Sequence, residues 1–273
     1  MVDVPIYDST HRPPPVVDEF VQAWRYRDLV VQLVRRDIVS RYKRSVLGVA
    51  WTMLNPLGMM IIMTIVFSQL FNSTRAYPAY LLVALVAWNF FAQTTIFAMR
   101  QLVWGSALIQ RIYMPKTLFA ISAAGTGLVN LLLAMIPLTL VLLVTGLPPQ
   151  WPALFLPVAI LLLVTFTVGI GLMLSAIVVY FPDVAEMYEI IITAWLYLTP
   201  IFYPVSIIPD SYRWWFTNLN PMYHIINLFR LPLYQGVWPS PEQVAVAALV
   251  AFGAFGIGWT VFTKRADDFA YRI

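Results

Sequence analysis

Long apolar stretches, separated by short charged or proline-rich segments, dominate the pattern of hydrophobic and polar positions along the chain. A helix needs about 20 apolar residues to cross roughly 30 Å of hydrocarbon. The uncharged run from Thr117 to Phe181 is too long for one crossing, and it divides at Gly146–Pro152, where prolines stop helix propagation. The pattern therefore predicts six transmembrane helices, at about 48–71, 78–99, 117–145, 153–179, 186–203 and 243–263.

Composition agrees with this pattern. The chain has 273 residues, of which 60% are hydrophobic and 11% are charged, whereas about a quarter of the residues in soluble domains are charged. A soluble fold cannot hide so much apolar surface, because its surface-to-volume ratio forces polar groups outward. We therefore predict an all-α integral membrane fold. The lack of cysteine excludes a disulfide framework and a thiolate metal site.

The positions of lysine and arginine predict the orientation. If the N-terminus is cytoplasmic, fourteen of these residues fall on the inner side and only Arg75, Arg213 and Arg230 fall on the outer side. Cytoplasmic loops carry the excess of basic residues, so we expect both termini in the cytoplasm. The net charge of +4 lies beside apolar spans, which indicates contact with the membrane surface and not with nucleic acid.

The chain before the first span is polar and carries three consecutive prolines. It lacks the short apolar core that follows the basic start of a cleavable signal. We expect residues 1–24 to form a cytoplasmic tail, loosely ordered over 1–19, and residues 25–273 to form a single transmembrane domain.

Residues 26–44 have the pattern of a basic amphipathic helix that lies in the inner membrane interface. Val30, Val34 and Ile38 recur every fourth residue, while the basic side chains point elsewhere. The helix either anchors the first span or forms a gate for an anionic lipid headgroup, because basic side chains at the surface suit a phosphate. The candidate gate residues are Arg35, Arg36, Arg41, Tyr42, Lys43 and Arg44.

The inner loop at 100–116 contains a short helix-compatible segment that is too amphipathic to insert. Leu108, Ile109, Ile112 and Tyr113 are costly to leave in water. We expect the membrane surface or a docked cytoplasmic partner to cover them, and a plain connector is the alternative.

The next inner loop carries the acidic residues Asp183, Glu186 and Glu189. We expect Asp183 to cap the fifth span and Glu186, three residues later, to complete a capping box. A cation site near a pore is the alternative interpretation.

The segment after the fifth span is the least regular part of the chain. Pro200, Pro204 and Pro209 interrupt it, and its later apolar stretch at 229–234 is shorter than a crossing. We expect two short re-entrant helices that dip into the outer leaflet, so that residues 203–236 form an outer gate region. An interfacial loop with aromatic anchors is the alternative.

The sequence lacks common devices for catalysis and energy coupling. It has no Gly-x-x-x-x-Gly-Lys-Ser/Thr for ATP phosphates, no His-Glu-x-x-His and no Gly-x-Ser-x-Gly. With only His11 and His224, a histidine metal site is not expected. No predicted span interior holds the ionisable group that an ion-coupled carrier needs. The energy must therefore come from elsewhere, or the flow is passive.

The predicted spans do carry neutral polar and aromatic groups. Asn89 and Gln93 share one helix face at a spacing of four residues. Sugars stack on aromatic rings and hydrogen-bond to amides, so such a lining suits a glycan conduit. Helix packing through polar contacts and interfacial aromatic belts is the alternative. The candidate conduit residues are Trp51, Asn55, Trp88, Asn89, Gln93, Trp195, Tyr197 and Tyr203.

Several sequence blocks resemble a known family. They are residues 26–38 (YRDLVVQLVRRDI), 41–48 (RYKRSVLG), 51–57 (WTMLNPL), 108–116 (LIQRIYMPK), 180–184 (YFPDV), 200–205 (PIFYPV) and 219–222 (LNPM). The resemblance is to the permease subunits of type 2 ABC exporters for bacterial surface polysaccharides, namely O-antigen, capsule and teichoic acid. It covers roughly residues 26–265. The chain departs from the family at Phe181-Pro182, where an arginine often precedes the aspartate, so the resemblance does not imply a charged contact from this loop.

The resemblance implies a permease that pairs as a homodimer in the bacterial cytoplasmic membrane. Two copies of a separate nucleotide-binding subunit would dock below it, with ATP and Mg²⁺ on that partner and no cofactor in this chain. The helix at 26–44 would admit a polyprenyl-pyrophosphate-linked glycan. The residues matching the coupling helix are Ser106, Leu108, Ile109, Gln110, Arg111, Ile112, Tyr113 and Met114. Those matching the outer gate helices are Trp214, Trp215, Phe229 and Tyr234.

The chain itself is then not an enzyme, and export of lipid-linked polysaccharide is the expected function. An ABC exporter for teichoic acid, a drug or a lipid is the first alternative, because composition does not separate the cargoes. A membrane-embedded polyprenyl-phosphate transferase is a distant alternative. It would need catalytic acids clustered at one interface, and the sequence offers none beyond the expected capping carboxylates.

Overall fold

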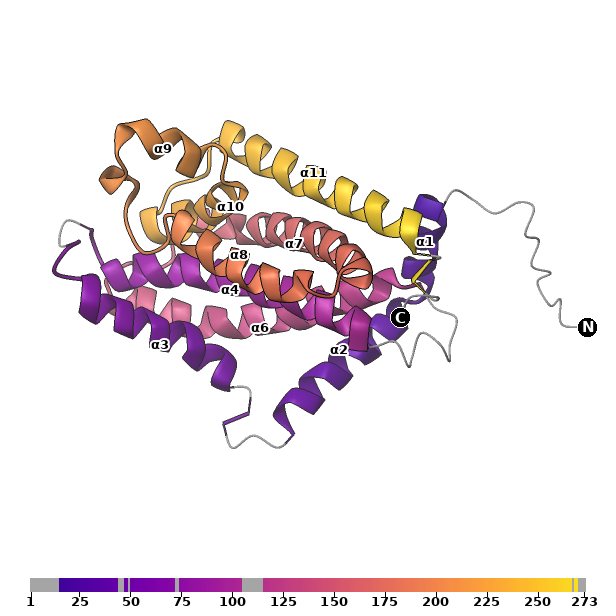
Figure 1. Ribbon diagram of the computed structural model, residues 1–273. Helices are drawn as coiled ribbons and strands as arrows, with labels where there is room; N and C mark the ends of the chain where they lie inside the picture. Colours follow the sequence, from indigo (N-terminus) through magenta and orange to yellow (C-terminus); the bar gives the residue numbers. More distant parts are fainter. Residues whose placement is uncertain are drawn as a thin grey trace, which may run out of the picture.

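The computed structural model describes residues 15–43, 47–48, 50–71, 74–104, 115–266 and 268–269. Every regular element in these ranges is a helix, as Figure 1 shows, which confirms the all-α prediction. The elements are α1 (Pro15–Arg25), α2 (Arg27–Tyr42), α3 (Ala50–Phe67), α4 (Tyr77–Trp104), α6 (Thr117–Val144), η2 (Trp151–Phe155), α7 (Leu156–Tyr180), α8 (Val184–Leu198), η3 (Val205–Ile207), α9 (Asp210–Thr217), α10 (Pro221–Arg230), η4 (Leu231–Gln235) and α11 (Pro241–Arg265).

Five helices in the described ranges are long and apolar enough to cross a membrane. They are α3, α4, α6, α7 with the preceding η2, and α11. Helix α8 has 15 residues, which at 1.5 Å per residue gives about 22 Å, less than the roughly 30 Å of hydrocarbon. The six predicted spans thus correspond to five long helices and one shorter helix, which lies against α4 and α7.

Helix α4 lies at the centre of the bundle. Its residues 79–88 are buried without interruption, and it contacts α3, α6, α7, α8 and α10. A helical segment that is apolar on every side, as these residues are, is typical of such a position, because no face needs water. The bundle has two ends, which we call the α2 end and the α10 end (Figure 1).

Helices α7 and α11 pack with their backbones in close approach. A Cβ atom added to Gly258 would lie 1.9 Å from the carbonyl oxygen of Gly169. One added to Gly169 would lie 2.5 Å from backbone atoms of Ala254 and Phe255. Small residues at helix interfaces allow this approach in membrane proteins, where packing and not hydrophobicity drives helix association.

Helix α1 corrects part of the expected tail, because residues 15–19, which we predicted to be loosely ordered, are helical. Thr117 Oγ1 donates a hydrogen bond of 2.9 Å to Glu19, and the ring of Phe20 lies edge-on to Trp259 at 5.9 Å. The polar composition of the tail obscured a helical repeat of apolar residues, whose side chains are more than half exposed. The repeat consists of Val17, Phe20, Val21 and Trp24.

A second correction concerns the start of α8. Asp183 has φ −61° and ψ −20°, which is a helical conformation, and its side chain makes no capping hydrogen bond. A capping residue needs an extended backbone to turn its side chain toward the first free N–H groups, so the expected Asp183–Glu186 capping box does not form. A capping box does form at the start of α11, between Ser240 and Gln243.

Candidate functional site

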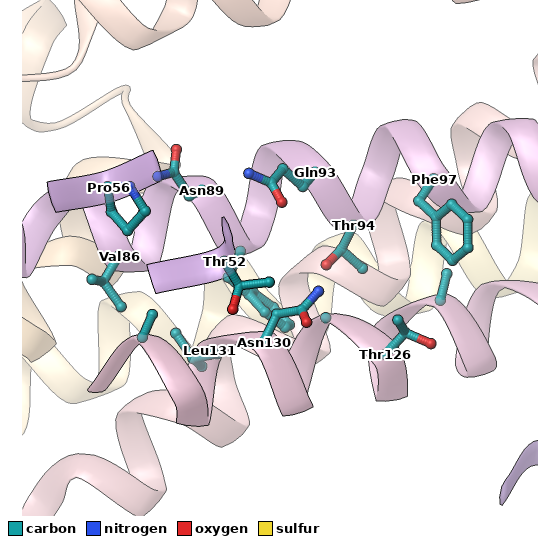
Figure 2. Close-up of a pocket in the computed structure, with 14 residues that line it drawn as sticks. Thr52, Pro56, Val86, Asn89, Gln93, Thr94, Phe97, Thr126, Asn130 and Leu131 are labelled. Atoms are coloured by element: carbon teal, nitrogen blue, oxygen red, sulfur yellow. The ribbon is translucent and has the colours of Figure 1, made fainter. Parts of the chain in front are cut away.

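A polar cavity lies between α3, α4 and α6. Its volume is about 40 Å³, and all of its polar side chains are uncharged. Figure 2 shows amides and hydroxyls from the three helices around one space. The polar lining residues are Thr52 from α3, Asn89, Gln93 and Thr94 from α4, and Thr126 and Asn130 from α6.

Two threonines turn their hydroxyls away from their own helices. Thr95, Thr167 and Thr263 each donate to the carbonyl four residues earlier, the usual partner of a buried helical threonine. Thr94 and Thr126 line the cavity instead, and at 4% and 2% exposure their hydroxyls have no hydrogen-bond partner among the described residues. The volume is sufficient for water molecules, which such groups hold.

The sequence creates this space locally. A Cβ atom on Gly127 would lie 2.2 Å from the Thr94 hydroxyl oxygen, so only glycine leaves room for that hydroxyl. Pro56 of α3 also lines the cavity, and it has no N–H to donate to the carbonyl of Thr52. The regular hydrogen-bond ladder of α3 is therefore interrupted where the helix borders the cavity.

The candidate conduit residues fall into different places. Asn89 and Gln93 line the cavity together, as their spacing predicted. Trp88 is 3% exposed and contacts Phe91 and Trp195 edge-on, with ring centroids 5.8 and 6.0 Å apart. Trp51, Asn55 and Tyr197 are exposed, and Tyr203 donates a hydrogen bond of 2.7 Å to the Tyr197 carbonyl. Their role in a conduit stays a prediction.

The candidate gate residues for an anionic lipid headgroup, predicted on the helix at 26–44, lie at the α2 end. Arg35, Arg36 and Lys43 are exposed. The side chains of Arg41 and Tyr42, and the whole of Arg44, lie outside the described residues. The apolar face of α2 packs on α6 through the buried Leu33 and through Val34, whose methyl lies against Gly125.

A polar contact at the same end was missed by sequence reasoning. Asp37 accepts hydrogen bonds from Arg36, at 3.0 Å, and from Gln101 of α4. Gln101 in turn accepts one of 3.2 Å from Ser122 of α6. This chain connects α2, α4 and α6. The only sign of this contact in the sequence was Asp37 itself, an acidic residue next to the basic residues of the helix.

The candidate coupling residues 106–114 lie outside the described residues. The described part of α4 ends at Trp104, and the chain is described again from Pro115. Just before this loop, Arg100 of α4 forms an ion pair with Glu189 of α8. The pair joins the predicted inner loop at 100–116 to the start of the predicted fifth span, and charges 89 residues apart gave no signal in the sequence.

The four candidate outer gate residues do not form one cluster. Trp214 and Trp215 of α9 are exposed, while Phe229 of α10 is fully buried. Tyr234 donates a hydrogen bond to the carbonyl of Arg75. Burial raises the pKa of Tyr234, and the nearby cations of Arg230 and Arg75 oppose the rise.

Two polar residues of this region were not among the candidates. Asn220 caps α10, accepting hydrogen bonds from the N–H groups of Met222 and Tyr223. Arg230 is 3% exposed, and its guanidinium lies 3.8 Å from the ring centre of Tyr80. In the sequence, the signal for Arg230 was a lone cation in an apolar stretch, and the signal for Asn220 was its position before a proline. Among the described residues, no group of three acidic, histidine or cysteine side chains is placed to hold a metal ion.

Comparison with known proteins gives consistent matches along the chain. Residues 28–234 match the ABC-2 type transporter family. The chain is 29% identical to the O-antigen export system permease protein RfbA of Myxococcus xanthus, over 92% of this chain and 98% of that protein. It is 26% identical to the protein of the same name from Klebsiella pneumoniae, over 89% and 94%. It is 22% identical to the polysialic acid transport protein KpsM of Escherichia coli, over 87% and 93%.

Proposed function

Because the chain belongs to the ABC-2 type transporter family, we propose that it is the permease subunit of an ATP-driven exporter of bacterial surface polysaccharide. The observation that carries the proposal is the match to glycan-export permeases over nearly the whole length of both chains. Five long apolar helices, one of which is the buried α4, support a location in the membrane.

The ATP-hydrolysing component of this exporter is a separate subunit. The sequence has no phosphate-binding loop of the Walker type, so two nucleotide-binding subunits would hold ATP and Mg²⁺ below a homodimer of this chain. Residues 106–114 would form the coupling helix that docks on them. The Arg100–Glu189 pair would pass motion of this loop to α8, because Arg100 lies near the end of α4, shortly before the loop.

A sixth crossing completes the membrane topology. Residues 199–203 continue from α8 and are mostly buried. They form bends and a turn in which the Ile201 N–H donates to the Thr199 carbonyl, and the sixth crossing that we propose consists of α8 together with this buried segment. The α2 end then faces the cytoplasm together with both termini, and the α10 end faces outward as a re-entrant outer gate. The excess of basic residues at the α2 end supports this orientation.

The chemistry of the pathway suits a neutral carbohydrate chain carried on a polyprenyl pyrophosphate. Exposed Arg35, Arg36 and Lys43 would attract the charged headgroup at the cytoplasmic surface. The amides of Asn89 and Gln93 line the cavity between α3, α4 and α6 and would hydrogen-bond to hydroxyl groups of the cargo. A teichoic acid, drug or lipid cargo is the alternative, and it would be shown by transport of that cargo by the purified complex.

The coupling role is tested by substituting Arg111 and Tyr113 with alanine. Export should fall while the complex still assembles and still hydrolyses ATP, because force no longer reaches the membrane helices. Trp238→Ala, an exposed change beyond α10, serves as the control. Wild-type export from both variants would refute the coupling role, and failure to copurify with an ATPase would refute the exporter itself.

The topology is tested with single cysteines, since the chain has none of its own. Arg27→Cys and Lys264→Cys should react with an impermeant maleimide only from the cytoplasmic side. Trp214→Cys should react only from the outer side. Opposite sides for Arg27 and Lys264 would exclude six crossings.

A further inference from the structure

The segment that joins α8 to the α10 end is buried but has no regular secondary structure. Ile201 and Phe202 are almost fully covered. Buried backbone carbonyls need hydrogen-bond donors, and irregular backbone at membrane depth survives only where the protein supplies them. Four consecutive carbonyls, those of Pro200, Ile201, Phe202 and Tyr203, each accept a hydrogen bond from a side chain.

The donors come from two other helices. Arg230 of α10 uses its two terminal nitrogens, which lie 2.6 Å from the Pro200 oxygen and 3.0 Å from the Ile201 oxygen. Tyr77 and Tyr80 of α4 donate to Phe202 and Tyr203, at 2.6 and 3.0 Å. The segment is therefore held by α4 on one side and by α10 on the other.

Arg230 is an unusual donor because its charge is buried. No carboxylate of the described chain forms a salt bridge with it. The two carbonyl dipoles and the face of Tyr80 are its electrostatic partners. A planar guanidinium reaches two acceptors at a fixed angle, whereas the ammonium of lysine is a point charge. The site therefore selects arginine for its geometry.

Asn220 makes a second connection at the other end of α10. Its Nδ2 donates to Thr199 Oγ1 at 2.9 Å and to the Leu198 carbonyl at 3.3 Å. Its Oδ1 caps α10 and also accepts a hydrogen bond of 3.0 Å from Trp195 Nε1. The last turn of α8 is thus bonded to the first turn of α10.

We propose that α8, residues 199–203 and α10 form one rigid unit, in which Arg230 and Asn220 are the positioning residues that make α10 follow α8. The opposite end of α8 is paired with α4 through Glu189 and Arg100, next to the loop at 105–114. A displacement that starts at this loop would therefore reach the α10 end without bending the unit. The assignment of this motion to gate opening rests on the proposed function.

The test measures distances between spin labels in the complex with its ATPase subunit. Labels are placed at Thr193→Cys on α8 and His224→Cys on α10, and the reference pair joins Thr193→Cys to Leu249→Cys on α11. All three side chains are at least partly exposed. A large excess of unlabelled chain ensures one labelled chain per complex. The α8–α10 distance should stay constant when ATP binds, while the α8–α11 distance shifts.

Substitution of the positioning residues should loosen the unit even without ATP. Arg230→Gln and Asn220→Ala should each broaden the α8–α10 distance distribution, and Arg230→Lys should restore it only in part. Arg213→Gln, which removes an exposed arginine of α9, should leave it narrow. An α8–α10 shift as large as the α8–α11 shift in the wild type, or a narrow distribution in both variants, would overturn the proposal.

The two hypotheses fail in different ways. If no ATPase subunit binds and no distance responds to ATP, the proposed function is wrong. The broadening in Arg230→Gln and Asn220→Ala, measured without nucleotide, still decides whether the unit is rigid. If Arg230→Gln does not fold, Asn220→Ala provides the same measurement from the other end of α10.

Discussion

The contact between α7 and α11 predicts that alanine substitutions at different glycines of α11 change the stability of the protein by very different amounts. In Gly258→Ala the new methyl would lie 1.9 Å from the Gly169 carbonyl oxygen, whereas ordinary contact begins at 3.4 Å. The obstacle is backbone, so it cannot rotate away as a side chain would. Helix α11 must therefore withdraw from α7 by about 1.5 Å along this contact.

The size of the effect follows from this separation. A gap of about 0.5–1 Å already forfeits a quarter to a half of the dispersion attraction, and overpacking in a core costs about 1–3 kcal/mol, occasionally more. The obstacle is rigid and the α7–α11 contact is extensive, so we expect a loss of about 3 kcal/mol. For a chain of 273 residues that corresponds to a melting temperature about 5 °C lower.

The matched controls are Gly253→Ala and Gly256→Ala on the same helix, where an added Cβ meets nothing within 4 Å. These changes should leave stability unchanged or raise it by up to about 1 kcal/mol, because alanine favours helix. Thermal denaturation of the purified protein, followed by size-exclusion chromatography, measures all three variants. A Gly258→Ala protein as stable as Gly256→Ala would refute the backbone-to-backbone contact.

Three further predictions follow from the site. Trp88→Ala should lower stability by about 3–5 kcal/mol, since the ring is buried between two aromatic neighbours; normal melting with reduced export would instead place the ring in a conduit. Thr94→Val combined with Thr126→Val should change stability by less than about 1 kcal/mol, because the lost hydroxyls have no protein partner, and a large loss would reveal a missing bond. Arg100→Glu and Glu189→Arg should each reduce export, and the double variant with the exchanged charges should restore it. The free energy of unfolding should shift by no more than about 1 kcal/mol in these variants.

The long helices were predictable because lipid imposes a simple requirement. Every backbone group in the hydrocarbon must be bonded within its own helix, so length and lack of charge suffice to locate α3, α4, α6, α7 and α11. Their boundaries agree within a few residues, apart from the longer α4. The sequence did not indicate that α8 ends at Leu198, because the apolar pattern continues through residues 199–203.

The residues that organise the site were harder to predict, since their partners are distant in sequence. Arg230 was assigned to an outer loop by its charge. It is in fact buried, and it donates hydrogen bonds to the carbonyls of Pro200 and Ile201. Asp183 had the sequence of a cap without the backbone conformation. Asn89 and Gln93 were correctly paired because both lie on one helix, where spacing alone decides the face.

The all-round apolar character of residues 79–88 of α4 has a consequence for how the protein is made. This helix leaves the ribosome before α6, α7, α8 and α10, the neighbours that will later surround it. A helix with a polar face would be poorly solvated by lipid during that interval. Residues 79–88 offer no such face, so this part of α4 can stay among acyl chains until later helices replace them. The apolar surface that suits this segment to the centre of the finished bundle also keeps it stable in lipid before the bundle forms.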